Sequence, residues 1–301
     1  MTVRCGLNRQ HRQYMDHNEG KKLKKIIIHP WNGTRVYGVR HVRKIVVNKF
    51  PRKIESEFLV QITCKEESEG GMLWEINKTS PEISEINEND KSLALLKSLE
   101  DFTYPMTLKT DTSGNFIALE NHKDWVENWR AKAKHLAMEE YDVNGNLDLF
   151  QKFYEIILDE RKFLENKNRE GFWKLLFLNF KIAIPLDPNY SHKESFYWDL
   201  MHLGSKHIKG ASAGYLLEGN FVLSFKSKNF VDKEMVAKAI KIYGLKQPYD
   251  IFTPTIDFEI NAKIEDQSRK LLNKTVFLEL SIEEQFNYKE EISIIFINEI
   301  A

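Results

Sequence analysis

The chain has 301 residues, of which 42% are hydrophobic and 29% charged, which is typical of a soluble protein with one or two packed domains and not of a disordered one. Its 44 Lys and Arg residues equal its 44 Asp and Glu residues, whereas a dedicated nucleic-acid-binding protein usually has a basic excess. No run of about 18 apolar residues occurs, so the sequence predicts no membrane-spanning helix.

The N-terminal segment and the cysteines indicate the expected cellular setting. Residues 1–22 are polar, lack periodicity and contain no apolar stretch typical of a signal peptide, so we expect a flexible segment. The two cysteines, Cys5 and Cys64, are too few for a disulfide framework, and neither lies in a CxxC pair. A reducing, cytoplasmic location is the expectation that follows.

Residues 23–120 are predicted to be rich in β-strands. Residues 34–47 alternate apolar and polar side chains over much of their length, which is the period of a half-buried strand. Glycines at 70–71 and 114 mark two tight hairpin turns, and a short helix is expected over 92–99. The expected strands cover 25–30, 34–47, 57–64, 72–77, 104–109 and 115–119.

Residues 121–180 are predicted to be helical. Asn121 can accept a hydrogen bond from the first helical turn, and Asp124 places a negative charge there. Trp125 and Trp129 fall on one face of this first helix. Two more helices are expected over 147–158 and 171–180, and the last is apolar enough to be buried.

Residues 181–301 are predicted to return to strands, with one helix that Asp232 caps and that ends near Gly244. Two strands are expected around a bend at Gly219, one before it and one after it. Three more are expected over 255–264, 275–280 and 292–297, and the last is hydrophobic enough to be a central strand of a sheet. The predicted fold class is α+β: mostly antiparallel strands in two halves, with the helical insert between them. The halves form either two sheets or one large curved sheet.

Two groups of polar residues raise the question of a metal site. Asp142, Asn144, Asn146 and Asp148 begin like a calcium loop, but Gly145 is misplaced and position twelve is Phe153, so a turn between helices is expected. A zinc site would need convergent ligands, and the five-residue spacing of the central histidines does not align them. The candidate zinc ligands are His192, His202, His207, Asp187, Glu194 and Asp199. We predict no metal and no cofactor.

No catalytic motif is recognisable. Ser212 lies in Gly210-Ala-Ser-Ala-Gly214, which lacks the nucleophile-elbow spacing and is predicted to be a flexible turn. Cys64 is expected to be a small core residue. Glu75, beside Trp74, and Glu218 keep a hydrolase with a dispersed carboxylate site as an alternative.

Several aromatic residues are candidates for contact with a ligand or partner, although paired tryptophans on a helix more often pack on a sheet. These candidates are Trp74, Trp125, Trp129, Phe221 and Phe225.

Separated parts of the chain resemble a diffuse group of uncharacterised bacterial proteins. The resemblance rests on residues 73–81, Tyr104-Pro105, the run 114–117, Asn121 and Trp129-Arg130, and this order of Trp and Arg departs from the group's pattern. It covers about a third of the chain and implies a shared fold. The resemblance carries no activity, but it implies a component of an assembly such as a contractile-injection-type system.

Three functional hypotheses follow. The first is a non-catalytic protein-binding or structural subunit of a bacterial assembly, with a protein partner or self-association. The second is a carrier that encloses an apolar ligand between the sheet and the helices. The third is the hydrolase with a dispersed carboxylate site.

Overall fold

The computed structural model describes residues 22–26, 33–68, 71–79, 82–84, 98–139, 147–178, 180–184, 191–200, 203–246 and 254–300. Some predictions therefore lie outside the described residues. These are the flexible segment up to residue 21, most of the helix expected over 92–99, and the start of the calcium-like loop at 142–146.

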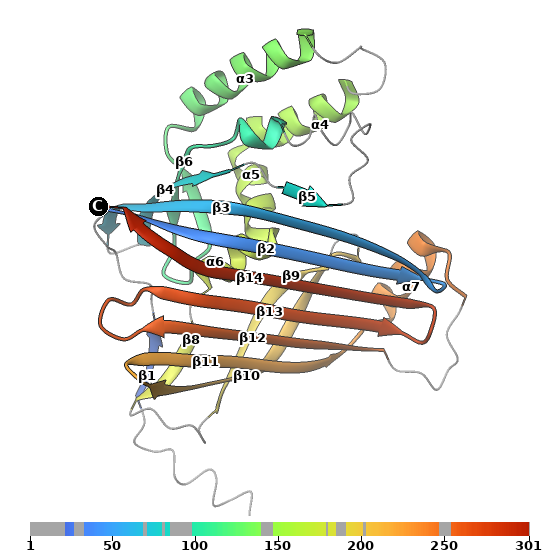
Figure 1. Ribbon diagram of the computed structural model, residues 1–301. Helices are drawn as coiled ribbons and strands as arrows, with labels where there is room; N and C mark the ends of the chain where they lie inside the picture. Colours follow the sequence, from blue (N-terminus) through green and yellow to red (C-terminus); the bar gives the residue numbers. More distant parts are fainter. Residues whose placement is uncertain are drawn as a thin grey trace, which may run out of the picture.

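Among the described residues, twelve strands form one large antiparallel sheet, in the order β7-β6-β4-β3-β2-β14-β13-β12-β11-β10-β9, and β5 pairs with β3 beside this path (Figure 1). The strands of its first half are β2 (Thr34–Val47), β3 (Phe50–Ser68), β4 (Gly71–Lys78), β5 (Glu82–Ser84), β6 (Met106–Thr110) and β7 (Phe116–Leu119). Those of its second half are β9 (Ser191–Asp199), β10 (Ser205–Leu217), β11 (Asn220–Phe230), β12 (Thr255–Glu265), β13 (Leu271–Ile282) and β14 (Phe286–Ile300). A separate two-stranded sheet pairs β1 (Lys22–Ile26) with β8 (Phe180–Ile184).

The C-terminal strand joins the two groups of strands. β14 pairs with β2 from Phe286 opposite Val47 to Ile300 opposite Thr34, with one bulge near Phe296. On its other side β14 pairs with β13 from Phe286 to Ile295, so over these residues its backbone is paired along both edges. The α+β class with mostly antiparallel strands is thus confirmed, and all described strands except β1 and β8 belong to one continuous sheet.

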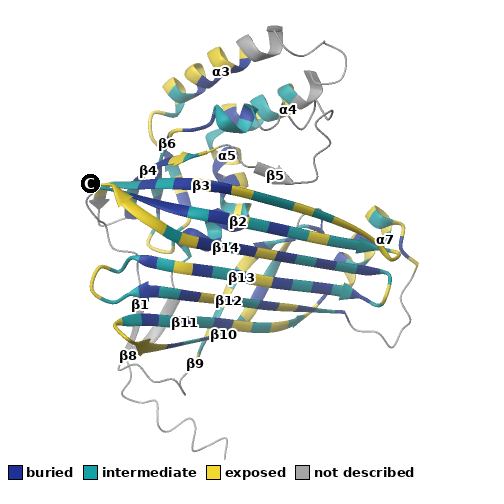
Figure 2. Cartoon of the chain, viewed as in Figure 1, coloured by how far each residue is buried: buried dark blue, intermediate teal, exposed yellow. Residues whose placement is uncertain are grey.

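The sheet has two different faces, because successive side chains of a strand point to opposite sides. On β12 the residues Ile256, Phe258 and Ile260 are fully buried, whereas Asp257 and Asn261 between and beside them are exposed. The buried and exposed colours alternate along the long strands in Figure 2. We call the face that carries the buried residues of β12 the inner face and the opposite one the outer face.

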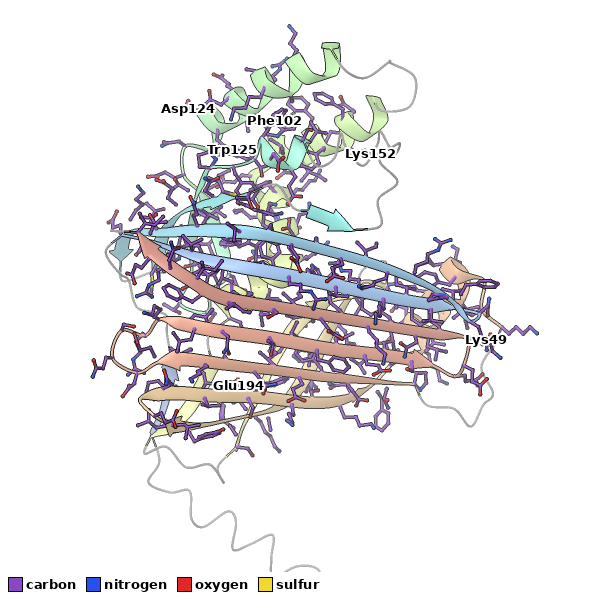
Figure 3. The ribbon with its side chains drawn as sticks, in the orientation of Figure 1. Lys49, Phe102, Asp124, Trp125, Lys152 and Glu194 are labelled. Carbon is purple, nitrogen blue, oxygen red and sulfur yellow. The ribbon has the colours of Figure 1, made fainter. Side chains whose placement is uncertain are left out.

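Helices cover the inner face of the sheet and the region next to β3. They are α3 (His122–Glu139), α4 (Leu147–Leu158), α5 (Glu160–Arg169), α6 (Gly171–Phe177) and α7 (Lys233–Tyr243). In Figure 1, α6 lies behind the strands β2, β14 and β13, and α3 and α4 stand above β3. Figure 3 shows Trp125 of α3 among the side chains of this helical group.

Helix α6 packs tightly against the inner face. A Cβ atom added at Gly171 would lie 2.9 Å from the Ile292 side chain of β14 and 3.1 Å from Trp198 of β9, so a larger residue would have to displace these side chains. The ring of Phe172 contacts Phe58 of β3 at a centroid distance of 4.9 Å. The prediction that this helix is buried is confirmed, although it ends at Phe177 and β8 begins at Phe180.

The two edge strands of the sheet, β7 and β9, have different surroundings. At β7, the Asn168 side chain of α5 accepts from the Phe116 backbone N–H at 2.8 Å and donates to the Phe116 carbonyl at 2.9 Å. Glu160 accepts from the Leu119 N–H at 2.8 Å. These side chains replace a neighbouring strand, which protects the edge from unwanted pairing. At the other end, Trp198 of β9 reaches Phe258 of β12, so the sheet curls toward its inner face.

One local prediction is wrong. Residues 210–214 were expected to form a flexible turn, but they lie inside β10, paired with β9 and β11. The glycine at 210 serves packing, since an added Cβ would lie 2.5 Å from the Phe225 ring and 2.4 Å from the Lys226 carbonyl oxygen.

Candidate functional site

The most strongly perturbed carboxylate lies on the inner face. Glu290 of β14 accepts from His41 Nε2 at 2.7 Å and Arg43 Nε at 3.0 Å through one oxygen, and from Trp198 Nε1 at 3.0 Å through the other. Burial raises the pKa of Glu290, but hydrogen bonds and nearby positive charge outweigh it and bring the pKa down to about 2. Burial lowers the pKa of His41, so the neutral ring donates to Glu290.

A second group of charges joins α5 and α6 to β4. Lys78 pairs with Glu100, and its ammonium group lies 4.4 Å from the centre of the Phe58 ring. Lys167 donates to Glu170 at 2.8 Å. Burial lowers the pKa of Lys167, but the charges of Glu170 and its neighbours raise it well above its usual value.

Each of these inner-face charges has a hydrogen-bond donor or an opposite charge as its partner. Glu290 has donors on both oxygens, and Lys78 and Lys167 each have a carboxylate partner. Among the described residues, no group of three or more His, Cys, Asp and Glu side chains is placed to bind a metal ion. Buried pairs of this kind fix the position of packed elements, so we assign the inner cluster a structural role in holding α6 and β9 on the sheet.

The outer face is held mostly by exposed ion pairs between neighbouring strands. Lys226 of β11 lies 3.3 Å from Glu259 of β12, and Lys289 of β14 lies 3.1 Å from Glu279 of β13. Exposed pairs contribute little to stability but keep a face hydrated. Exposed apolar side chains on this face also include Tyr197 of β9, Tyr215 of β10 and Phe230 of β11. Two further regions of the face, centred on β14 and β13, bear on binding.

The first region is an aliphatic patch. Gly38 of β2 lies opposite Leu59 of β3 on one side and opposite Ile295 of β14 on the other. Without a side chain at Gly38, Ile297 folds over this position, with its Cδ1 3.2 Å from where a Cβ would lie. We define the aliphatic patch by its exposed members, with their exposed fractions: Leu59 (39%), Ile295 (54%), Ile297 (53%) and Ile300 (49%).

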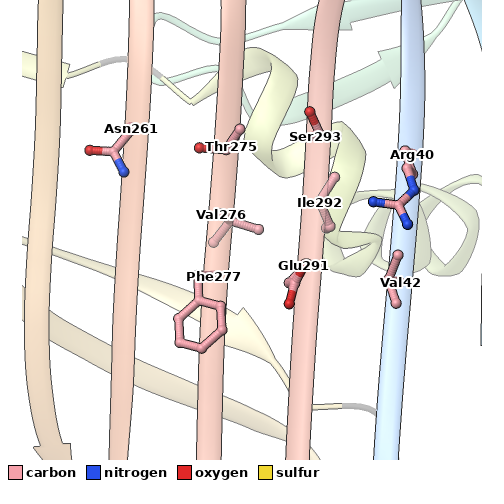
Figure 4. Close-up of a pocket in the computed structure, with 9 residues that line it drawn as sticks. All are labelled: Arg40, Val42, Asn261, Thr275, Val276, Phe277, Glu291, Ile292 and Ser293. Carbon is pink, nitrogen blue, oxygen red and sulfur yellow. The ribbon is translucent and has the colours of Figure 1, made fainter. Parts of the chain in front are cut away.

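The second region is a half-open hollow of about 200 Å³ that we call the polar hollow (Figure 4). Thr275 of β13 and Ser293 of β14 lie directly opposite each other, and their small side chains leave the space. In the next row, Phe277 lies opposite Glu291. The lining residues are Arg40, Val42, Asn261, Thr275, Val276, Phe277, Glu291, Ile292 and Ser293.

The aromatic candidates from the sequence lie in separate parts of the interior. Trp74 donates to Thr110 Oγ1 at 2.9 Å, and Trp129 donates to the Leu99 carbonyl at 3.1 Å. Trp125 is half-buried and donates to the Thr103 carbonyl at 3.1 Å. Phe221 and Phe225 are buried on β11. The structure does not bring these five residues together, and their contact with a ligand stays a prediction.

The polar candidates do not converge either. His207 stacks on Tyr197 at a centroid distance of 4.9 Å, and it lies on the face of β10 opposite to that of Ser212, which pairs with His192. Asp187 and His202 lie outside the described residues. Glu75 pairs with Lys65 at 2.6 Å on β4, whereas Glu218 lies in the turn between β10 and β11.

The aliphatic patch and the polar hollow were not predicted from the sequence. One signal was present: residues 292–297 are apolar at almost every position, which predicts a strand buried on both faces. The structure buries Ile292 and Ile294 but exposes Ile295 and Ile297.

The part of the interior that the second hypothesis would need as a cavity is filled between β9 and β12. The rings of Phe196 and Phe225 have their centroids 5.0 Å apart, and Phe258 lies 5.5 Å from Phe196 and 6.0 Å from Phe225. Such distances are those of packed aromatic pairs. Among the described residues, no helix is long and apolar enough to cross a membrane.

Comparisons with known proteins give little further information. No family model and no curated protein matches the chain. Among solved structures, one determined for lipid–protein interactions in lipovitellin is similar, with a TM-score of 0.43 and 10% sequence identity. The match covers 90% of this chain and 25% of the lipovitellin chain, so this chain spans about a quarter of that protein. No functional statement follows from so distant a likeness.

Proposed function

We propose that this protein is a non-catalytic, protein-binding subunit and that its partner docks on the outer face of the long sheet. The observation that carries the proposal is the aliphatic patch. Leu59, Ile295 and Ile297 are exposed on neighbouring strands, in a face where ion pairs join several of the other strands. Contiguous exposed apolar side chains with a polar surround are typical of protein interaction sites.

The patch can make a useful contribution to binding. Burying the exposed halves of four aliphatic side chains would contribute roughly 4 kcal/mol in total. That amount corresponds to about a thousandfold in affinity. A bacterial assembly, such as a contractile-injection-type system, is the setting that we propose for such a subunit.

The two other hypotheses receive less support. An apolar-ligand carrier needs an enclosed space lined by the Phe-rich strands, and Phe196, Phe225 and Phe258 contact one another there. A hydrolase needs two acids that face each other with perturbed pKa values, and Glu290 is instead bound by three donors. We therefore favour the first hypothesis.

Site-specific photo-crosslinking in the producing cells tests the proposal. A benzophenone amino acid is placed at Ile295, and in a control chain at Lys228, an exposed residue of β11 on the same face. We expect one defined protein adduct from position 295 and none of that mass from position 228. The adduct from position 295 should disappear when Ile297 is also replaced by Lys, because a charge in the patch opposes burial.

Adducts that are equal at both positions, or none at position 295 in a folded chain, would contradict the proposal. Folding is checked by the thermal unfolding temperature, which the exposed Ile297→Lys substitution should leave within a few degrees.

A further inference from the structure

We infer that the polar hollow is a pocket for one cationic side chain, an arginine or a lysine, of the protein that docks on the aliphatic patch. The inference rests on the proposed function and specifies the chemistry of the partner. The hollow and the patch are continuous, because Ser293 of the hollow and Ile295 of the patch are successive outer-face residues of β14.

The size of the hollow selects a side chain rather than a cofactor. Pockets for drug-sized ligands usually have about 300–1,000 Å³, whereas this one has about 200 Å³ and is half open. Its floor is formed between Thr275 and Ser293, and Phe277 and Glu291 stand side by side along one wall (Figure 4). A long, thin side chain can enter such a space from a partner lying across the sheet.

The polar groups of the hollow are mostly acceptors that the protein does not use. Glu291 forms no ion pair or hydrogen bond with any other described residue, and the same holds for the hydroxyl groups of Thr275 and Ser293. Asn261 uses its amide N–H toward Glu259 at 3.0 Å, and Figure 4 shows its carbonyl oxygen directed away from Thr275 and Phe277, so Asn261 is not one of these acceptors. An uncompensated carboxylate with further acceptors favours a donor with positive charge.

The positive charge of Arg40 does not oppose this assignment. Arg40 donates to Glu55 at 2.6 Å and also lies 3.3 Å from Glu57, and Lys53 shares Glu55, so two carboxylates balance these two cations. The remaining wall is the ring of Phe277, which is 37% exposed. An aromatic face beside a carboxylate stabilises a cation from two sides.

The test uses small probes and methyl NMR, and it does not require the partner. Nα-acetyl-arginine methylamide is titrated against the full chain, with the methyl groups of Thr275 and Val42 as reporters at the hollow. Nα-acetyl-citrulline methylamide is the neutral probe of nearly equal shape. We expect saturable shifts with a Kd in the millimolar range for the arginine probe, as befits a ligand of this size, and none for citrulline.

Two substitutions locate the binding. Glu291→Gln should weaken the arginine probe about fivefold, and Phe277→Leu by a similar factor, since each removes one partner of the cation. Asp257→Asn is the matched control, because Asp257 is an exposed outer-face carboxylate outside the hollow. Its effect on the Kd should be less than twofold.

Equal shifts with the citrulline probe, or an unchanged Kd in Glu291→Gln, would overturn the inference. Its failure can be told apart from failure of the proposed function. If position 295 gives an adduct but the arginine probe does not bind, the docking surface is supported and the cation pocket is refuted. If the arginine probe binds but position 295 gives no adduct, the cation pocket is supported and the proposed docking of a protein partner is refuted.

Discussion

Replacing Glu290 by Gln should destabilise the protein by several kcal/mol at neutral pH. The pKa of Glu290 moves from 4.5 to about 2 on folding, which corresponds to about 3 kcal/mol of stability. Glutamine keeps the shape but removes the charge that Arg43 and His41 face. Arg43 also loses its carboxylate partner, but its side chain is 33% exposed, so solvent screens part of that loss.

The pH dependence provides the sharper test. Because the folded pKa of Glu290 is depressed, its contribution is fully present above about pH 4.5 and is lost as the pH falls toward 2. His41 adds to acid sensitivity at higher pH, since burial lowers its pKa below 6.5 and its protonation opposes folding. In Glu290→Gln, the decline in stability between pH 4.5 and 2 should be reduced, whereas the decline below pH 6.5 should remain.

Urea unfolding followed by tryptophan fluorescence from pH 2.5 to 7 measures both effects. Glu291→Gln is the matched control, because the neighbouring side chain lies on the outer face and is exposed. Its free energy of unfolding should change by less than about 0.5 kcal/mol. If Glu290→Gln loses less than about 1 kcal/mol, or keeps the full acid decline, then the charge on Glu290 does not hold β9 on the inner face of the sheet.

Three further substitutions test the packing. Gly210→Ala should cost about 1–3 kcal/mol in urea unfolding, since its Cβ would lie 2.5 Å from the Phe225 ring, and a neutral result would mean that β10 has room to move. Burial lowers the pKa of Lys274 to about 7, so stability should rise with pH by about 3 kcal/mol between pH 7 and 9.5. Lys274→Met should abolish that rise, and an equal rise in the variant would refute the assignment. Asn168→Ala should speed hydrogen exchange at the Phe116 amide, and unchanged exchange would mean that Asn168 does not cap β7.

Local signals in the sequence predicted local structure well. Asp232 caps α7 by accepting from the Met235 N–H, and Gly244 ends the helix in the left-handed conformation, with φ of 63°. The Asp111 carboxylate accepts from the N–H groups of Ser113 and Asn115 and holds the β6–β7 turn. These interactions join residues two to four apart, so the residue types alone carry the information.

Features that depend on distant residues could not be predicted. The pairing of β2 with β14 joins residues about 250 positions apart, and nothing in either strand alone names the other. Helix α5 was missed because it is strongly polar and buries only Phe163, Leu164 and Lys167. The polar hollow depends on Thr275 and Ser293 meeting across two strands, which requires the register of β13 on β14.

The position of the aliphatic patch within the sheet determines how a partner can bind there. Ile295 lies in the part of β14 whose backbone pairs with β13 on one side and with β2 on the other, whereas Ile297 lies past the last pair with β13. A partner strand therefore cannot add to β14 at Ile295, although strand addition is a common way to recognise an exposed sheet edge. Contact at Ile295 must be made face-on by side chains, and specificity then requires a polar feature within reach. The polar hollow, two residues along the same strand face, supplies that feature, which is why we treat the two regions as one docking surface.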